Sequence, residues 1–338
     1  MLARPAKTRT LPHALGAGGE LPAREVACNL CGARDEEVIV RKEGYRFVRC
    51  RKCGLIYVNP QIHPEAARRI YSEEYFRHGG AALGYEDYLQ DKPLYTAMFE
   101  REVHLLGRHR RPGRLLDVGC AMGFFLEAAA KAGWEPFGVE VSRFAAERAE
   151  RLFSGRIHVG TLEDARYAPA FFDAIVCYST LEHLCDPLGA LREAHRILKP
   201  DGVLAVSVPN VAHWLARRSF QWKPTEHLFY FSPKTLSAML SAAGFAPLAT
   251  REMKRCMTLG RLVERADHYL GLGRSIRPLL ALMGLLRLRD HMVFVSEGLM
   301  VTYAKKRDAK PSSSSPPCEV RVKCACEVCL AHFKNTSP

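Results

Sequence analysis

The sequence lacks an apolar run of the roughly 18 residues that a membrane-spanning helix requires. Its longest candidate, Leu279–Leu288, is too short and has arginine on both sides. Residues 1–24 lack the apolar core of a secretory signal, carry several basic side chains and contain one acid, Glu20. Organelle transit peptides share that composition, but a disordered leader over residues 1–24 is the preferred interpretation. A cytoplasmic location follows by default.

Acidic residues are the minority charge, with 36 Asp and Glu against 49 Lys and Arg, a formal net charge of +13. A basic excess invites a nucleic-acid partner when it gathers on one face. Here it is spread over residues 41–52, 108–114 and 251–289 and the stretch around residue 305. We therefore prefer solvated surface charge and keep a nucleic-acid partner as the less favoured interpretation.

The twelve cysteines do not form an evenly spaced set, which argues against a disulfide framework. Four lie within residues 28–53, four lie isolated in the middle of the chain, and four lie near the end. The last group has irregular spacing and follows the disorder-prone run SSSSPP; it consists of Cys318, Cys324, Cys326 and Cys329. We expect no second metal site there.

The first group forms two CxxC pairs, residues 28–31 and 50–53, separated by eighteen residues. Gly32 and Gly54 follow the pairs directly and permit the tight turns on which both thiolates converge. Four thiolates close a tetrahedral zinc sphere, so the site would be structural rather than catalytic. The expected ligands are Cys28, Cys31, Cys50 and Cys53. This pattern predicts a zinc ribbon over residues 25–60, whose ligands do not reveal what the ribbon contacts.

From residue 114 onward, short apolar strands alternate with amphipathic helices, which is typical of a parallel α/β sheet. Strands are expected at 114–118, 135–140, 156–159, 172–177, 202–208, 245–252 and 292–304. Helices are expected at 123–132, 142–153, 187–198 and 233–243. The predicted fold class is therefore α/β, a Rossmann-like doubly wound seven-stranded sheet preceded by the zinc ribbon.

Other segments complete the predicted organisation. Residues 61–110 form a helical lead-in with aromatic anchors such as Tyr71 and Tyr75, and residues 111–304 form the sheet domain. A basic helical insertion spans 253–290, and residues 305–338 form a disordered tail. The insertion either covers the site at the strand ends or packs against the core, and the sequence leaves both interpretations open.

The most informative stretch is LLDVGCAMGFF, residues 115–125, in which a buried strand enters a small-residue turn and then a helix. Such a turn lies at the carboxyl end of the sheet, where doubly wound folds bind ligands. Gly119 and Gly123 let the backbone approach a ligand closely, and Glu140, ending the next strand, can accept two ribose hydroxyls. Asp117 would repel a pyrophosphate but suits a cation, which argues against a dinucleotide cofactor.

These residues resemble the first motif of class I S-adenosylmethionine-dependent methyltransferases, Asp-x-Gly-x-Gly-x-Gly. Ala121 replaces the middle glycine, and we expect it to be tolerated with a negative φ. The segments FDAIVC, LEHLCDP and LKPDG, which begin at residues 172, 181 and 198, resemble the fourth strand, its loop and the turn before strand five in the ubiquinone-biosynthesis-type branch. The resemblance covers about residues 95–305. An N-terminal CxxC…CxxC ribbon is also familiar from sugar-modifying relatives.

The resemblance implies S-adenosylmethionine as cofactor and assigns residues to it by position. Tyr178 would contact it, Arg101 would bind its methionine carboxylate, and Thr161 and Leu162 lie where the adenine is expected. Nearby Glu163 and Asp164 leave the adenine contact ambiguous. The full predicted cofactor set is Arg101, Asp117, Gly119, Ala121, Gly123, Glu140, Thr161, Leu162 and Tyr178.

Methyl transfer from a sulfonium requires alignment of the reactants and, for hydroxyl or amine acceptors, removal of a proton. The predicted catalytic residues are His183 in LEHL and His227 in PTEHLFYF, with Tyr230 a weaker third. A packing role for His183 is an equal alternative. The preferred function is methyl transfer to a hydroxyl, amine or carbon of a metabolite or sugar. Alternatives are an RNA or protein methyltransferase docking through the ribbon, and a non-catalytic ribbon adaptor; the oligomeric state is unknown.

Overall fold

The computed structural model describes residues 9–11, 21–42, 44–71, 73–77, 88–214, 222–270 and 277–307. Residues 308–338 lie outside this part of the chain. The four C-terminal cysteines and most of the expected tail therefore lie outside the described residues. The tail was expected to begin at residue 305, but the last strand extends to Lys306.

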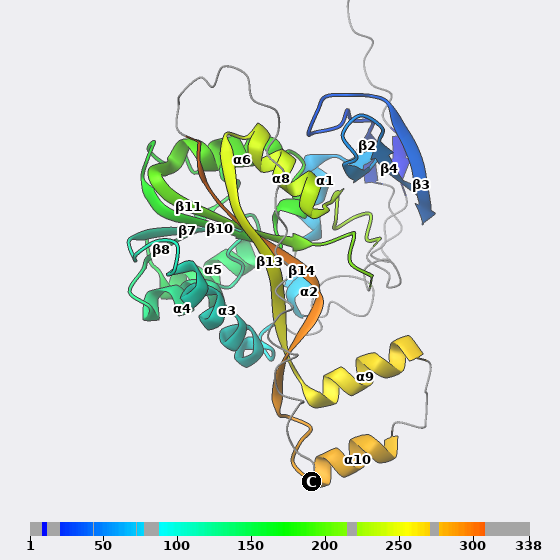
Figure 1. The fold of residues 1–338 in the computed structure, drawn as a ribbon, viewed down its shortest axis with the longest axis vertical. Coiled ribbons are helices and arrows are strands. Elements are labelled where there is room, and N and C mark those ends of the chain that lie inside the picture. Colours follow the sequence, from blue (N-terminus) through cyan, green and yellow to red (C-terminus); the bar gives the residue numbers. More distant parts are fainter. Residues whose placement is uncertain are drawn as a thin grey trace, which may run out of the picture. The chain divides into compact units, whose positions relative to one another are not determined.

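A seven-stranded sheet in the order β13-β14-β11-β10-β7-β8-β9 forms the centre of the chain and confirms the predicted fold class (Figure 1). Its five parallel strands are β7 (Arg114–Val118), β8 (Glu135–Glu140), β9 (Ile157–Val159), β10 (Phe172–Tyr178) and β11 (Leu198–Pro209). Antiparallel β14 (Met292–Lys306) and β13 (Phe245–Thr258) complete one edge.

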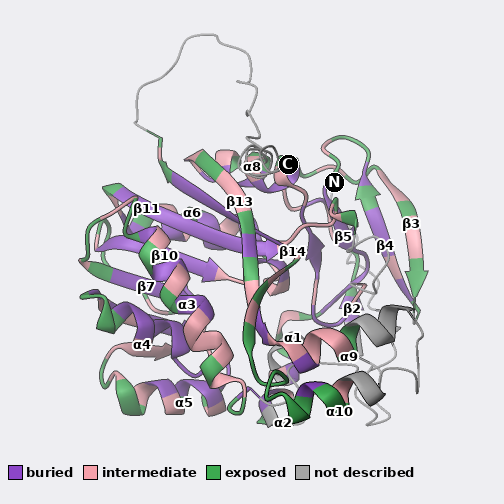
Figure 2. Cartoon of the chain, turned by 60° about the horizontal axis from the view of Figure 1, so that its bottom comes forward, coloured by how far each residue is buried: buried purple, intermediate pink, exposed green. Residues whose placement is uncertain are grey.

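Helices cover both faces because the central strands carry apolar side chains on both sides. Figure 2 shows that β7, β10 and β11 are largely buried. In β7, Leu115 packs into one core cluster and Leu116 into the other. The cluster of Leu115 is shared with α3 (Lys92–Leu106), α4 (Phe124–Lys131) and α5 (Arg143–Leu152). The cluster of Leu116 is shared with α6 (Pro187–Ile197) and α8 (Pro233–Ala242). The sheet is therefore doubly wound.

Residues 36–58 form the predicted ribbon strands, β3 (Glu36–Lys42), β4 (Tyr45–Cys50) and β5 (Ile56–Val58). A fourth strand of this small sheet, β12 (Phe229–Tyr230), comes from the large domain, and the order is β12-β5-β4-β3. Buried ribbon side chains such as Phe47 and Tyr57 belong to the same core cluster as α6 and α8. The ribbon is therefore packed into the large domain.

Two short strands lie in the segment that we expected to be a disordered leader. β1 (Arg9–Leu11) pairs with β2 (Leu21–Arg24), which pairs with β6 (Gln61–Ile62) just after the ribbon. The expectation therefore does not hold for these residues, because the pairing satisfies backbone groups that the composition alone left unassigned. The lead-in continues with α1 (Pro64–Ile70) and α2 (Glu73–Arg77).

The basic insertion begins later than we expected. β13 runs through residue 253 to Thr258 because its register with β14 continues out to Met292, whereas β11 pairs with β14 only from Leu299 onward. The two strands thus leave the sheet as a long hairpin that carries α9 (Leu259–Leu270) and α10 (Arg277–Leu285). Among the described helices, none combines the length and apolar character needed to cross a bilayer.

Candidate active site and metal centre

The four ribbon cysteines lie together. Their sulfur atoms are all within 4.8 Å of one another, with Cys28 Sγ 3.4 Å from Cys53 Sγ and Cys31 Sγ 3.5 Å from Cys50 Sγ. A tetrahedron of thiolates about 2.3 Å from zinc has S–S edges of roughly 3.8 Å. The donor set therefore fits a structural zinc ion.

Each cysteine pair lies in a hydrogen-bonded turn that ends on a glycine. The amide of Gly32 donates to Cys28 O at 2.8 Å, and the amide of Gly54 donates to Cys50 O at 2.9 Å. Gly32 has φ 71° and Gly54 φ 79°, the left-handed region that side chains disfavour. The predicted role of the two glycines in the turns is thereby confirmed.

The turn after β7 is held by the carboxylate that ends β8. The amide of Ala121 donates to Glu140 Oε2 at 2.9 Å, and the amide of Ser142 donates to Oε1 at 2.8 Å. Burial raises the pKa of Glu140, although these two amides act in the opposite direction. Each carboxylate oxygen keeps a second lone pair, so the group remains able to accept hydroxyl donors.

Glycine is required at the start and end of this turn. Gly119 has φ 80°, and a Cβ there would lie 2.4 Å from Thr180 Oγ1; Gly123 has φ 84° and begins α4. The expectation for Ala121 was wrong, because its φ is +46° rather than negative. A left-handed alanine costs about 1–2 kcal/mol. The amide that Ala121 donates to Glu140 helps to hold this conformation.

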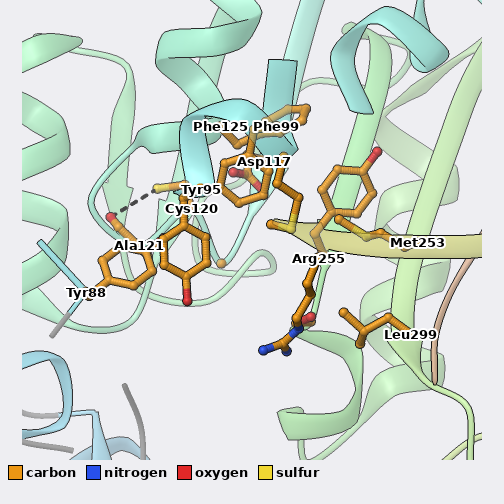
Figure 3. Close-up of a pocket in the computed structure, with 14 residues that line it drawn as sticks. Tyr88, Tyr95, Phe99, Asp117, Cys120, Ala121, Phe125, Met253, Arg255 and Leu299 are labelled. Atoms are coloured by element: carbon orange, nitrogen blue, oxygen red, sulfur yellow. Dashed lines mark hydrogen bonds between the residues drawn. The ribbon is translucent and has the colours of Figure 1, made fainter. Parts of the chain in front are cut away.

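A pocket opens beside the turn (Figure 3). Aromatic side chains including Tyr88 and Tyr95 lie on one side of it, and Met253, Arg255 and Leu299 lie on the other. Its lining comes from α3 and the residues just before it, β7, the turn, α4, the end of β10 and the β13–β14 hairpin: Tyr88, Tyr95, Met98, Phe99, Asp117, Gly119, Cys120, Ala121, Phe125, Tyr178, Ser179, Met253, Arg255 and Leu299. The hairpin therefore contributes Met253, Arg255 and Leu299 to the site, whereas no described residue of α9 or α10 lines it, and both interpretations of the insertion stay open.

Asp117 and Tyr178 give this pocket its polar character. Burial, followed by the nearby charge of Glu140, raises the pKa of Asp117 to about 8. The buried hydroxyl of Tyr178 has no hydrogen-bond partner among the described residues. A ligand with a positive charge for Asp117 and an acceptor oxygen for Tyr178 would satisfy both groups. The cationic amino-acid end of S-adenosylmethionine fits this requirement.

The contact of Arg101 with the cofactor stays a prediction, and its buried Nη1 has no hydrogen-bond partner among the described residues. Arg101 does not line the pocket, and its guanidinium carbon lies 5.5 Å from the ring centre of Phe294. The pocket arginine is Arg255, from β13. No sequence pattern indicated Arg255, because residue 255 was assigned to the insertion and only the extended register of β13 brings it to the site.

Thr161 and Leu162 follow β9 but do not line the pocket. The amide of Thr161 donates to Asp164 Oδ2 at 3.2 Å, and the amide of Asp164 donates to Thr161 Oγ1 at the same distance. Leu162 is buried. These bonds form a local turn, and the adenine contact stays a prediction.

His183 and His227, far apart in the sequence, are brought together with ring centres 4.8 Å apart. His183 lies in a 3-10 turn, η1 (Leu181–His183), at the end of β10, and His227 precedes β12. Burial lowers the pKa of His183 to about 4 and lowers the pKa of His227 well below its ordinary value. Both rings are therefore neutral at pH 7, and their burial makes them weak bases.

The partners of His183 define which nitrogen is free. Nδ1 lies 2.9 Å from the carbonyl oxygen of Glu226 and 3.0 Å from the hydroxyl oxygen of Tyr71. A carbonyl only accepts, so Nδ1 carries the proton and Nε2 holds the lone pair. Nε2 lies 3.8 Å from Oε1 of Glu182, a carboxyl group whose pKa burial raises to about 8. The basic nitrogen thus has a protonated carboxyl group as its neighbour.

Further polar side chains surround the two histidines, and the sequence analysis assigned none of them to catalysis except Tyr230. The hydroxyl of Tyr230 accepts the amide of Lys223 at 3.0 Å, and burial raises the pKa of this phenol well above its ordinary value. Tyr75 donates to Glu226 Oε2 at 3.4 Å. Tyr71 and Tyr75 appeared in the sequence only as aromatic anchors.

The charge of one pocket residue, Arg255, affects the group of side chains around the two histidines. The positive charge of Arg255 contributes to lowering the pKa of Glu182 and of His227. A carboxylate oxygen of Glu182 and one ring nitrogen each of His183 and His227 also lie within 4.8 Å of one another, close enough to bind a metal ion. Neither histidine is among the residues that line the pocket.

Comparison with known proteins agrees with this geometry. Residues 91–250 match a family model described as a methyltransferase domain. A ubiquinone biosynthesis O-methyltransferase of Idiomarina loihiensis is 32% identical over 154 residues, covering 40% of this chain and 63% of that protein. One from Xanthomonas campestris pv. campestris is 35% identical over 128 residues, covering 35% and 53%. The chain spans between about half and two thirds of the curated relatives it matches.

Solved structures also align with this chain. A SAM-dependent methyltransferase from Archaeoglobus fulgidus is 19% identical, with a TM-score of 0.47, and the alignment covers 65% of this chain and 99% of that one. A SAM-dependent methyltransferase from Leishmania major is 13% identical, with a TM-score of 0.46 and coverage of 72% and 82%. The family match is thus a similarity of residues 91–250, just under half of the chain, to a methyltransferase domain.

Proposed function

We propose that this chain transfers the methyl group of S-adenosylmethionine to a small-molecule acceptor. The observation that supports this most is the juxtaposition of the Glu140-held turn, the pocket with Asp117 and Tyr178, and two neutral histidines at the end of the adjoining strand. The relatives above are named as O-methyltransferases. For this chain we propose a hydroxyl, amine or carbon acceptor in a metabolite or sugar.

The cofactor, when bound, supplies a methyl group on a positively charged sulfur. Glu140 would accept hydroxyl donors, Asp117 would balance positive charge, and Tyr178 would donate to a carboxylate. Arg255, which we did not predict, lines the pocket and pairs with Glu297 at 3.6 Å; we propose that it also contacts that carboxylate. Together these side chains would fix the orientation of the methyl donor, which is the main requirement of a direct displacement.

Proton removal belongs to the histidine pair in this proposal. Nε2 of His183 accepts the acceptor's proton, while Nδ1–H stays bonded to the carbonyl of Glu226. His227 is the second base candidate, and the buried phenol of Tyr230 is better suited to holding the loop at Lys223. The raised pKa of Glu182 avoids a competing buried negative charge beside Nε2.

Zinc in the ribbon is part of the proposal as a structural ion. The four thiols support it by their mutual distances. A ribbon that docks RNA or protein is less favoured, because Arg49 lies 3.3 Å from Glu37 and Arg51 lies 3.3 Å from Asp35, which offsets their charge. A cytoplasmic location also remains a proposal.

The test uses S-adenosylmethionine carrying a labelled methyl group, incubated with the protein and with separate small-molecule and macromolecular fractions of a cell lysate. We expect label to enter the small-molecule fraction, and His183→Gln and His227→Gln to abolish transfer while still binding the cofactor. Label appearing only in RNA or protein would favour the ribbon-docking alternative. Absence of cofactor binding by the wild-type chain would favour the adaptor.

A further inference from the structure

The ribbon contacts the two segments that carry His183 and His227, and it does so through both of its cysteine turns. The second turn leads through Leu55 into β5, and Leu55 O accepts the amide of Cys50 at 2.9 Å. β5 pairs antiparallel with β12, Tyr57 opposite Phe229 and Ile56 opposite Tyr230. This pairing begins two residues after His227.

Leu228, the residue after His227, is fixed on both sides. Its carbonyl accepts the amide of Val58 in β5 at 2.9 Å, and its amide donates to the carbonyl of Glu182 at 2.8 Å. His183 completes the arrangement, because its Nδ1 donates to the carbonyl of Glu226 at 2.9 Å. Residues 226–228 are thus held between the ribbon and η1.

The first cysteine turn holds the segment after His183. Asn29, between Cys28 and Cys31, donates from Nδ2 to Asp186 Oδ1 at 2.8 Å and accepts the amide of Leu188 on Oδ1 at 2.9 Å. Asp186 is the N-cap of α6 and also accepts the amide of Gly189 at 2.9 Å. Asn29 therefore fixes the start of the helix only three residues beyond His183.

The cofactor turn has a different set of supports. Residues 119–121 are held by the side chain of Glu140 and by the carbonyl of Val139. Among the pocket-lining residues of the described chain, none belongs to the ribbon. Disturbing the ribbon should therefore affect the histidine pair and leave the cofactor contacts intact.

We propose that the ribbon is a clamp that sets the relative position of His183 and His227, with Asn29 as a positioning residue. This deepens the proposed function, since it assigns the ribbon to the acceptor side of the site. Loss of the two hydrogen bonds of Asn29 should shift the equilibrium between the closed and the locally opened form of these segments toward opening by about tenfold. The effect should be confined to residues 182–190 and 226–231.

The experiment compares the full-length, zinc-containing wild type with Asn29→Ala. Arg51→Ala is the matched control, because Arg51 has the same position in the second turn. Among the described residues, its side chain pairs only with Asp35 and Glu37, both in the ribbon. Hydrogen exchange of the Leu188 and Leu228 amides and ¹⁵N signals of the labelled histidines are recorded, with His183→Gln and His227→Gln assigning the signals.

We expect Asn29→Ala to bind zinc and S-adenosylmethionine like the wild type. Its Leu188 and Leu228 amides should exchange about tenfold faster. His183 should lose its single Nδ1-protonated form. Asn29→Asp keeps an acceptor for Leu188 but repels Asp186, so it should give an intermediate result, and Arg51→Ala should match the wild type.

Unchanged histidine signals and Leu228 exchange in Asn29→Ala, with faster Leu188 exchange alone, would overturn the clamp. If Asn29→Ala also lost affinity for S-adenosylmethionine, by as much as its amides lose protection, the clamp would be overturned as well, because the ribbon would then support the whole fold. Failure of the wild type to bind S-adenosylmethionine is a separate result: it refutes the proposed function but leaves the histidine signals readable.

Discussion

Cofactor affinity should depend on pH through Asp117, because burial raises the pKa of this carboxyl group to about 8 in the free protein. Below pH 8 the free site holds a proton that a bound cation must displace. Above pH 8 the carboxylate is already ionised. Affinity for S-adenosylmethionine should therefore rise with pH and level off near pH 8 to 9.

The magnitude follows from the ionised fraction of Asp117. A group of pKa 8 is about one-tenth ionised at pH 7 and about nine-tenths ionised at pH 9, so the dissociation constant should fall about tenfold between them. Calorimetric titration in buffers of different ionisation enthalpy should also show release of nearly one proton at pH 7. Between pH 4 and 8 the same shift lowers the stability of the empty protein as pH rises, since the folded state retains the proton.

Asp117→Asn is the variant that isolates this effect. It should weaken binding at pH 9 and abolish the pH dependence. A wild-type affinity that does not change between pH 7 and 9, with no proton released, would refute the role given to Asp117.

Three further predictions concern neighbouring residues. Ala121→Gly should raise the free energy of unfolding by about 1 kcal/mol in denaturant titrations, because it relieves the left-handed backbone of the alanine. Ala130→Gly, on the exposed face of α4, should lower it by about as much. Equal destabilisation by both changes would contradict the strain assigned to Ala121. Arg255→Gln should weaken cofactor binding about fivefold, because a partly exposed charged contact is worth about 1 kcal/mol, and Arg101→Gln should not weaken it. Calorimetry that shows the reverse order would assign the carboxylate contact to Arg101. The double variant Cys28→Ser, Cys50→Ser should reduce zinc, measured by mass spectrometry, from about one ion per chain to none. A second zinc ion per chain in the wild type, lost in His227→Gln, would show that Glu182, His183 and His227 also bind metal.

The sheet was predictable from the sequence because each strand and helix carries its own apolar periodicity. β7 and β8 begin and end at the predicted residues, and α6 and α8 end within one residue of prediction. The cysteine turns were equally readable, since two residues between ligands and a following glycine have a direct geometric meaning.

The site was predictable only where its residues lie close in the sequence. Glu140 and the Gly119 turn belong to adjacent strands, whereas Arg255 reaches the pocket through a strand whose length depends on its partner β14. The φ of Ala121 is imposed by the turn and not by alanine itself. Tyr71 beside His183 depends on how the lead-in packs, which no local pattern specifies.

Calorimetric titration of S-adenosylmethionine into wild type, Glu140→Ala and Glu147→Ala measures the interaction on which the proposed function depends. Glu140 bonds the amides of Ala121 and Ser142, while Glu147 lies exposed on α5. We predict clear binding by wild type and Glu147→Ala and a loss of at least tenfold in Glu140→Ala. Equal binding by all three proteins, or none by the wild type, would contradict a methyl-donor site at this turn.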